Sequence, residues 1–288
     1  MNTVGSIVRK IIEFCTAHDG LKNVLILLLM FCSFQVYADK KYNKRFNKAI
    51  QSDTLEMAEQ VLKDWELNGP HDGDYYAAHF NLHYNRGIKL IVMLSENLPV
   101  YAEQSMSIRD SSGNDAGYMY SGYVIKDSLQ RDSAAMWLNQ GVALFPQRLD
   151  LWAGLVRFYL QLDSVDSVMA VLDRLKVWKL QHVEQKWIWT SDSRIRKQSE
   201  SIGEILQYYF LKFWNFDNYL LQAVHVADIG IALCPKNAVF YNDKAGVEYT
   251  KQNYEEALSI FEQALKLSPR DKLIKQNIEY IKSIIANQ

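Results

Sequence analysis

Residues 241–269 decide the fold, and they read YNDKAGVEYTKQNYEEALSIFEQALKLSP. Two amphipathic stretches flank the short polar segment KQN, and Pro269 follows the second stretch. Small residues recur at Ala245, Ala257 and Ala264, with large apolar residues beside them. Two helices can cross closely only where their side chains are small, while large neighbours fill the grooves. The stretch therefore predicts two packed helices, the second of which ends before Pro269 because proline lacks an amide hydrogen.

The turn between these helices carries the signature of a helix start. Asn253 precedes the second amphipathic stretch, and Glu256 follows three residues later. Asparagine is a favoured N-cap residue, and an acidic residue at this spacing can reach back to the cap. We therefore expect Asn253 and Glu256 to form a capping box at the start of the second helix.

A small residue followed by a proline five positions later occurs three times. The segments are Gly141–Pro146, Gly230–Pro235 and Ala264–Pro269, and the last two prolines are 34 residues apart. This spacing is the tetratricopeptide period, and the last unit resembles that family. The matching positions are Tyr241, Ala245, Tyr254, Ala257, Phe261, Ala264 and Pro269. Lys244 and Glu248 depart from the family pattern.

The resemblance implies an all-α fold, an α-solenoid of tetratricopeptide helix-turn-helix repeats. Three more degenerate units share its register, and their matching residues are Tyr118, Gly122, Ala134, Leu138 and Gly141; Trp152, Leu155, Tyr159, Val168, Leu172 and Leu175; and Ala223, Gly230 and Pro235. Ile274, Ile278, Ile281 and Ile285 form the apolar stripe of an expected C-terminal capping helix over residues 272–286. The repeats and this helix would make up residues 114–288.

Two parts of the chain depart from the regular period. About 21 extra residues fall near residues 177–202, around the tryptophans Trp187 and Trp189, and their role is open. Residues 39–113 are expected to hold divergent helical repeats, with Leu55, Ala58, Leu62 and Trp65 as the buried stripe of one helix. Residues 74–86 and 89–94 are also expected to be helical, and residues 107–117 to form a loop.

Composition supports long helices and offers no sign of nucleic-acid binding. The chain of 288 residues is 49% hydrophobic and 23% charged, and it contains only 13 Gly and 5 Pro. Many-stranded β folds need more turn residues than this. The formal net charge is −1, and the one dense basic run is short, comprising Lys40, Lys41, Lys44, Arg45 and Lys48. Nucleic-acid binding normally requires a concentrated basic face, so this run is interpreted as a solvated flank.

Residues 1–38 are interpreted as a secretory signal peptide. Basic residues precede the short apolar run VLILLLMFCSF at residues 24–34, and the sequence VYA ends at Ala38 before Asp39. These are the three parts of such a signal, and the run is too short for an ordinary membrane span. Cleavage between Ala38 and Asp39 would give a periplasmic or cell-surface protein that contacts the membrane only through its signal. The alternative is an uncleaved anchor that carries a cytosolic array.

No catalytic, metal-binding or cofactor-binding motif is evident. His79 and His83 are four residues apart on an expected helix, where they could share a metal ion. The glutamate of the zinc peptidase motif is missing between them, however, and no third ligand is specified. We therefore expect no cofactor, no metal and no catalytic residues. The alternative is a helical enzyme of unknown reaction that depends on a metal at these histidines.

The family resemblance implies a concave groove that is lined by the first helix of each repeat and holds a peptide or protein partner. Transferring that frame predicts six groove residues, which are Ala153, Arg157, Tyr208, Lys212, Asn242 and Tyr249. Arg157 and Lys212 hold equivalent positions and could bind a carboxylate. The family's carboxylate-clamp set is not reproduced. The sequence therefore predicts a non-enzymatic adaptor of the cell envelope, whose partner and oligomeric state it does not specify.

Overall fold

The computed structural model describes residues 41–52, 54–102, 104–190, 193–194 and 198–287. The expected signal segment, including Ala38 and Asp39, lies outside these residues. Within the described part of the chain, no helix is long and apolar enough to cross a membrane. The chain divides into two compact units between Leu82 and His83.

The first unit begins with a helix over residues 41–51, followed by α3 (Leu55–Asn68). The predicted stripe of α3 is confirmed at Ala58, Leu62 and Trp65, which are buried, whereas Leu55 is half-buried. The Trp65 ring stacks on Tyr42 with 5.5 Å between ring centres, and its Nε1 donates to the carbonyl of Pro70 at 2.9 Å. A large aromatic residue therefore joins the two helices and the turn that follows them.

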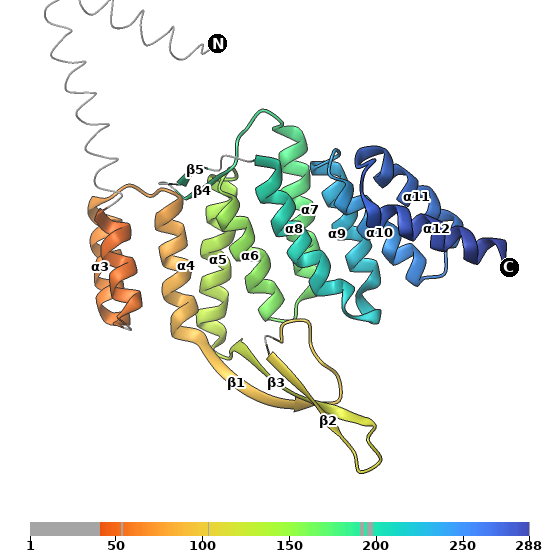
Figure 1. The fold of residues 1–288 in the computed structure, drawn as a ribbon. Coiled ribbons are helices and arrows are strands. Elements are labelled where there is room, and N and C mark those ends of the chain that lie inside the picture. The colour runs from red at the N-terminus through yellow and green to blue at the C-terminus, as the bar shows by residue number, and fades with distance from the viewer. Residues whose placement is uncertain (1–40, 53, 103, 191–192, 195–197, 288) are drawn as a thin grey trace, which may run out of the picture. The chain divides into compact units, whose positions relative to one another are not determined.

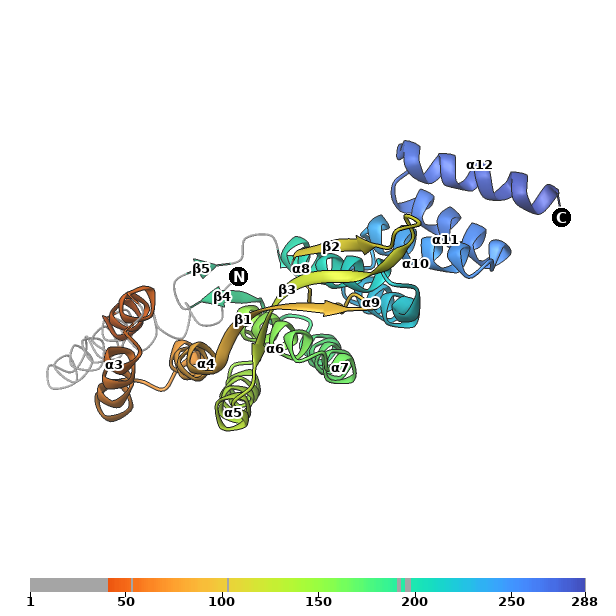
Figure 2. The same ribbon diagram turned by 90° about the horizontal axis from the view of Figure 1, so that it is seen from below.

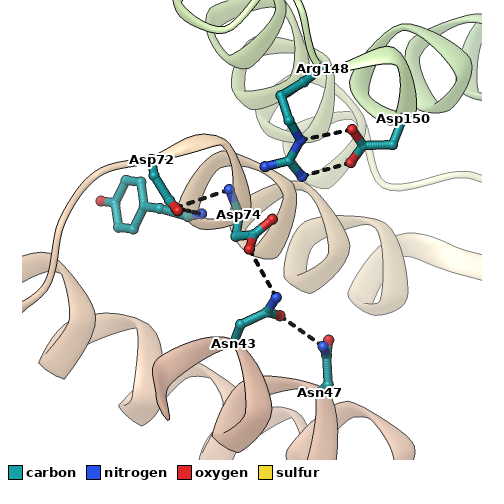
Figure 3. A network of polar contacts seen from close by, with 7 residues as sticks. Asn43, Asn47, Asp72, Asp74, Arg148 and Asp150 are labelled. Carbon is teal, nitrogen blue, oxygen red and sulfur yellow. Dashed lines mark hydrogen bonds and ion pairs between the residues drawn. The ribbon is translucent and has the colours of Figure 1, made fainter. Parts of the chain in front are cut away.

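The helix α4 (Gly73–Gly87) confirms the predicted helix over residues 74–86 and reaches from the first unit into the second. Asp72 caps its start, because one carboxylate oxygen accepts from the backbone N–H groups of Asp74 and Tyr75, both at 3.0 Å (Figure 3). The buried Asp74 carboxylate accepts from Asn43 Nδ2 at 3.1 Å, and Asn43 accepts in turn from Asn47 at 2.7 Å. These contacts fix α4 to the helix at residues 41–51.

The second unit is mainly a row of helices that pack in successive pairs (Figure 1). They are α5 (Ser128–Leu144), α6 (Leu149–Gln161), α7 (Val165–Gln181), α8 (Gln198–Trp214), the short η1 (Asp217–Tyr219), α9 (Leu220–Leu233), α10 (Ala238–Thr250), α11 (Tyr254–Leu267) and α12 (Lys272–Ala286). α6 packs on α7, α8 on α9 and α10 on α11, and α12 covers the last pair. The predicted helical repeat fold is confirmed.

Small residues lie where neighbouring helices approach most closely. Ala245, Ala257 and Ala264 are fully buried between α10, α11 and α12, together with Phe261. On α9, a Cβ atom at Gly230 would lie 2.3 Å from the buried ring of Phe240 on α10. No side chain fits there, so glycine is required by the approach of the two helices. The prediction that small residues allow the helices to cross closely is thus confirmed.

The capping box predicted at Asn253 and Glu256 is wrong. Asn253 begins α11 but makes no capping hydrogen bond with its side chain. Its Nδ2 instead donates to Glu248 Oε2 at 2.6 Å, and Lys251 Nζ donates to Glu248 Oε1 at 2.9 Å. Burial alone would raise the pKa of Glu248, but these donors hold it below its usual range. Glu248, which departs from the family pattern, therefore stabilises the turn between α10 and α11.

A small antiparallel sheet interrupts the helical row, and it corrects three predictions. Its strands β1 (Ile88–Ser95), β2 (Gln104–Arg109) and β3 (Asp115–Ile125) are ordered β1-β3-β2. The helix predicted over residues 89–94 is therefore part of β1. Tyr118 and Gly122, expected on a repeat's first helix, lie on β3. The loop predicted over residues 107–117 shrinks to the turn at residues 110–114.

Local chemistry explains why these residues form strands. Asp110 accepts from the backbone N–H groups of Ser112 at 2.8 Å and Asn114 at 2.9 Å, and Gly113 adopts a φ of 86°. This is the behaviour of a tight turn between paired strands. A short apolar run such as residues 88–94 fits a strand or a helix equally well, and pairing with β3 decides between them.

The sheet lies between α4 and α5 along the chain, where the sequence predicted the first helix of a repeat (Figure 1). His83 Nδ1 lies 2.9 Å from Gln130 Oε1 on α5, and the Tyr84 hydroxyl donates to Gln161 on α6 at 2.7 Å. The predicted second helix of this repeat is confirmed, since Ala134, Leu138 and Gly141 are buried on α5. The first helix expected near residues 114–125 is the strand β3 instead.

The extra residues near 177–202 lengthen α7 and form a short hairpin, β4 (Ile188–Thr190) with β5 (Ser193–Arg194). Trp187 is buried, and its ring centre lies 5.1 Å from that of Trp178. The segment also touches the start of α6, where the backbone of Arg148 pairs with Ile188. The buried Arg148 guanidinium makes two bonds to Asp150, at 2.8 and 2.7 Å (Figure 3). Trp187 therefore belongs to the packed interior.

Candidate partner-binding surface

The six predicted groove residues lie on the first helices of the three helix pairs. Ala153 and Arg157 are on α6, Tyr208 and Lys212 on α8, and Asn242 and Tyr249 on α10. Arg157 and Tyr208 are exposed, and the other four are half-buried. The carbonyl of Ala153 accepts from the Tyr209 hydroxyl at 3.2 Å, which joins α6 to α8. Tyr208 and Lys212 line one cavity, Tyr249 lines a second and Asn242 lines a third. The binding role of the six residues stays a prediction.

Tyr208 and Lys212 face the loop that joins β1 to β2. Lys212 Nζ donates to the carbonyl of Ala102 at 3.4 Å, and it lies 5.9 Å from the centre of the Tyr208 ring. Val100 of the same loop is buried. A cavity of about 330 Å³ remains between this loop and α8. The inserted sheet thus supplies part of the wall at this end of the predicted groove.

Tyr249 lies in an aromatic cavity at the other end, with a volume of about 290 Å³. Its lining comes from α8, α10, α11 and α12, and comprises Trp214, Gly246, Tyr249, Thr250, Phe261, Asn277, Tyr280 and Ile281. None of these residues is charged. The Tyr249 ring centre is 6.0 Å from that of Tyr280 and 5.8 Å from that of Tyr254. We call this space the aromatic cavity; its walls suit an apolar or aromatic side chain.

Two features keep the aromatic cavity open and polar at its rim. A Cβ atom at Gly246 would make only ordinary contact with the Trp214 ring, at 3.6 Å, so a larger side chain there would extend into the cavity. The hydrogen bond with Tyr280 raises the pKa of Tyr249, with burial as a further cause. The Tyr249 hydroxyl therefore stays protonated near pH 7 and can donate or accept a hydrogen bond.

A buried carboxyl group, Asp243, lies on α10 one turn before Gly246. Burial raises its pKa to about 7, although side-chain hydrogen bonds from Gln207 and Asn242 oppose the shift. Within the described residues, Asp243 Oδ2 and the amide oxygens of Gln207 and Asn242 have no hydrogen-bond partner. The contact between α8 and α10 thus contains a polar cluster with unused acceptors, which is costly in a buried place.

Asn242 also borders a third cavity, of about 380 Å³, at the opposite end of α10. This cavity is lined by the turn before α10 and by the start of α12, including Lys236, Asn237 and Asp271. Its charged and amide groups distinguish it from the aromatic cavity. The two cavities therefore offer an apolar and a polar site at the two ends of one helix.

The turns of the helix pairs repeat atom by atom. The residue before each proline donates its N–H to the small residue four positions earlier, in Phe145 to Gly141 and Cys234 to Gly230 at 2.8 Å, and in Ser268 to Ala264 at 3.0 Å. The ring of the residue six positions after the proline bonds back to the proline carbonyl, from Trp152 to Pro146 at 2.9 Å and from Tyr241 to Pro235 at 3.3 Å. The positions around each proline that the sequence predicted to be equivalent thus make the same hydrogen bonds in successive repeats.

The repeats are tetratricopeptide-like. The turns inside the pairs agree with this, because Asp163 and Gln252 occupy equivalent positions and both have a positive φ, of 54° and 63°. The N–H groups of the residues after them donate to Tyr159 at 3.0 Å and to Glu248 at 2.9 Å.

Solved structures of tetratricopeptide repeat proteins are among those similar to this chain. One, from Parabacteroides merdae, is 13% identical with a TM-score of 0.38, over 87% of this chain and 74% of that one. YrrB, described as having an unusual peptide-binding site, is 14% identical with a TM-score of 0.35, over 82% and 89%. Pseudomonas aeruginosa pilF is 10% identical with a TM-score of 0.37, over 87% and 85%.

No family model matches the sequence, and no curated protein matches it. The repeated turn contacts and the small residues buried between helices identify the helical repeats within this chain itself.

The two histidines considered for metal binding have packing contacts in the tetratricopeptide-like array. The His79 ring centre lies 4.5 Å from that of Tyr75, and His83 contacts Gln130. Among the described residues, no group of three or more His, Cys, Asp or Glu side chains is arranged to hold a metal ion. The enzyme alternative therefore gains no geometric support from these histidines.

Sequence reasoning missed Trp214 and Tyr280, which are both in the wall of the aromatic cavity. Tyr280 is 58% exposed and lies next to the buried Ile281, just outside the apolar stripe of α12. An aromatic residue beside the stripe of a capping helix was the available signal. Trp214 ends α8, where its side-chain direction depends on the packing of α10.

Proposed function

We propose that this protein is an exported, non-enzymatic adaptor that binds a peptide or protein partner on the first helices of its tetratricopeptide-like repeats. The aromatic cavity carries the proposal. It is apolar, uncharged and open, and it gathers two tyrosines and a tryptophan, residues that commonly anchor protein contacts. An apolar or aromatic side chain of the partner enters this cavity, and polar groups at its rim bind the adjoining main chain.

Filling the aromatic cavity tests this proposal. Gly246→Leu places an aliphatic side chain in the cavity while favouring the helix, so the fold is retained. A photo-crosslinking residue at Thr250, on the cavity wall, then reports whether a partner is captured in cells. We expect a specific protein with Gly246 present and at least a tenfold loss of capture with Gly246→Leu. Gln263→Leu, at an exposed position on α11, is the matched control and leaves capture unchanged.

Two outcomes contradict the proposal. One is the absence of any specific crosslink from Thr250 in the compartment where the protein resides. The other is equal capture by Gly246→Leu and by the unaltered protein, because the partner would then not use the cavity.

The charged residues at the other end of the predicted groove provide a separate prediction. If the partner also reaches α6 and α8, Arg157→Glu and Lys212→Glu will each reduce its recovery after crosslinking, since both would repel a carboxylate that the native residues attract. Equal recovery with both variants would confine the partner to the α10–α12 end. Asp217→Lys, which changes an exposed charge on η1, is the control.

Export is the second part of the proposal, and the first 38 residues support it. Their basic start, short apolar run and VYA sequence before Asp39 are the parts of a cleavable signal. Sequencing the N-terminus of the protein isolated from cells tests it. Asp39 as the first residue supports export, whereas an intact N-terminus favours the anchored alternative.

A further inference from the structure

The inserted sheet has one face that is uncharged and exposed. Register places Leu94, Met119 and Met106 in one row across the three strands, and Val92, Ser121 and Gln104 in the next. Residues paired across strands point to the same side, so these rows share a face with Leu90, Tyr123 and Ile108. We call it the open sheet face.

The apolar side chains of the open sheet face are largely in solvent. The exposed fractions are 62% for Leu90, 67% for Val92, 69% for Leu94, 57% for Met106 and 37% for Ile108. The opposite face is covered over its central strand, where Tyr120 is only 4% exposed and its hydroxyl lies 3.2 Å from that of Tyr101, whereas Met93 beside it is 42% exposed. Figure 1 shows the sheet below the row of helices, with the β2–β3 turn at its free end, and Figure 2 shows the strands side by side in the order β1-β3-β2.

Its lack of charge limits what the open sheet face can bind. None of its nine residues is charged, so it has no basic group to attract anionic lipid headgroups. In a symmetric contact between two copies the same patch faces itself, so a patch of one charge sign would be repelled by its copy. A neutral apolar face meets no such repulsion. The same face of another copy is therefore a matching surface.

We propose that the open sheet face binds the same face of a second copy of this chain, forming a two-fold dimer of stacked sheets. Packed sheets lie about 10 Å apart with their facing side chains interdigitated. A face of nine short-strand positions is smaller than the roughly 800 Å² per partner of standard stable complexes. The dimer is therefore weak, with a dissociation constant on the order of micromolar to millimolar.

Sedimentation velocity on the protein isolated from expressing cells tests the dimer, over a concentration range of about 5 to 500 µM. We expect the average sedimentation coefficient to rise with concentration. Met106→Lys puts a charge on the open sheet face, beside Met119 of the central strand, and we expect this variant to need at least a tenfold higher concentration for the same rise in sedimentation coefficient. Ser107→Lys is the matched control, because it adds the same charge to the other face of the same exposed strand. It behaves like the unaltered protein.

Each other result overturns the proposal. A constant sedimentation coefficient for the unaltered protein removes the dimer. Association that Met106→Lys does not weaken, or that Ser107→Lys weakens equally, places the contact on another surface. Circular dichroism of both variants confirms that the fold is retained, which is expected because both positions are exposed. None of these outcomes depends on the aromatic cavity or its partner.

Discussion

At the scale of single residues, two buried acids on α10 have opposite environments. Glu248 receives bonds from Asn253 and Lys251, so its charged form is stabilised in the folded protein. Asp243 is surrounded mainly by amide groups and apolar side chains, and burial raises its pKa to about 7. Only the first acid holds a turn together. The second is kept at an energetic cost, as is common for residues at binding surfaces.

Asp243 makes the stability of the protein depend on pH. Its folded pKa, about 7, lies above the unfolded value of 3.8, so the folded state binds the extra proton. The stabilisation of the folded state by this proton is present in full below about pH 4 and is lost as the pH rises towards 7. We expect the free energy of unfolding to fall over this range by a few kcal/mol at most, on the order of what this pKa difference allows. Asp243→Asn should remove this dependence and unfold at a higher urea concentration than the unaltered protein at pH 8.

Urea unfolding at pH 5 and pH 8 is the measurement, with Asp217→Asn as the control at an exposed site. The control should follow the unaltered protein at both pH values. An Asp243→Asn protein that keeps the full difference between pH 5 and pH 8 would show that other groups cause it.

At the scale of elements, the helices α10, α11 and α12 were predictable because each has a long amphipathic pattern and its turns carry Gly, Pro or Asn signals. The sheet was not. Residues 88–94 form an apolar run of a length that suits either state, and the partner that stabilises it as a strand is about 30 residues away on β3. The capping box failed for a related reason, since Glu248 on α10 competes for the Asn253 side chain.

The candidate site was predictable only in part. The position of Tyr249 on a first helix follows from the repeat frame, and the structure lines a cavity with it. The loop of the inserted sheet beside Lys212 could not be foreseen, because the insertion itself was interpreted as helical. The aromatic cavity also needs Trp214 and Tyr280, whose meeting depends on how α8 and α12 pack against α10.

Close helix contact gives a prediction for α9. Gly230→Ala places a Cβ atom 2.3 Å from the buried Phe240 ring, so α9 and α10 must separate. We expect the free energy of unfolding to fall by about 1–3 kcal/mol, despite the better helix propensity of alanine. Gly154→Ala is the control on α6, where the nearest atom is Leu138 Cδ1 at 3.7 Å. It should be neutral or stabilising, and thermal unfolding of both variants measures the difference.

At the scale of the whole molecule, each helix pair of the second unit packs chiefly on its neighbours, as in other repeat arrays. Stability is then distributed along the row rather than concentrated in one core. The capping helix α12 covers the last pair through Ile274, Ile278 and Ile281. Loss of this helix would expose the apolar side of α11 to water.

Ile278→Asp tests this arrangement by placing a charge beneath α12. We expect a loss on the order of 4 kcal/mol, felt mainly by the C-terminal repeat. Hydrogen exchange should show α11 and α12 losing protection while α6 and α7 keep theirs. Gln276→Asp, at an exposed position on α12, is the control. Uniform loss of protection over all helices would show that the array unfolds as one unit.

The position of the sheet between α4 and α5 has a consequence for how the chain acquires its structure. Contacts among α6 to α12 join mostly neighbouring segments, and such contacts form quickly. His83, near the end of α4, can reach Gln130 on α5 only after the whole stretch from Ile88 to Asp127 has closed into a loop, which carries an additional entropic cost. This contact should therefore form last, on helices that the C-terminal repeats have already stabilised.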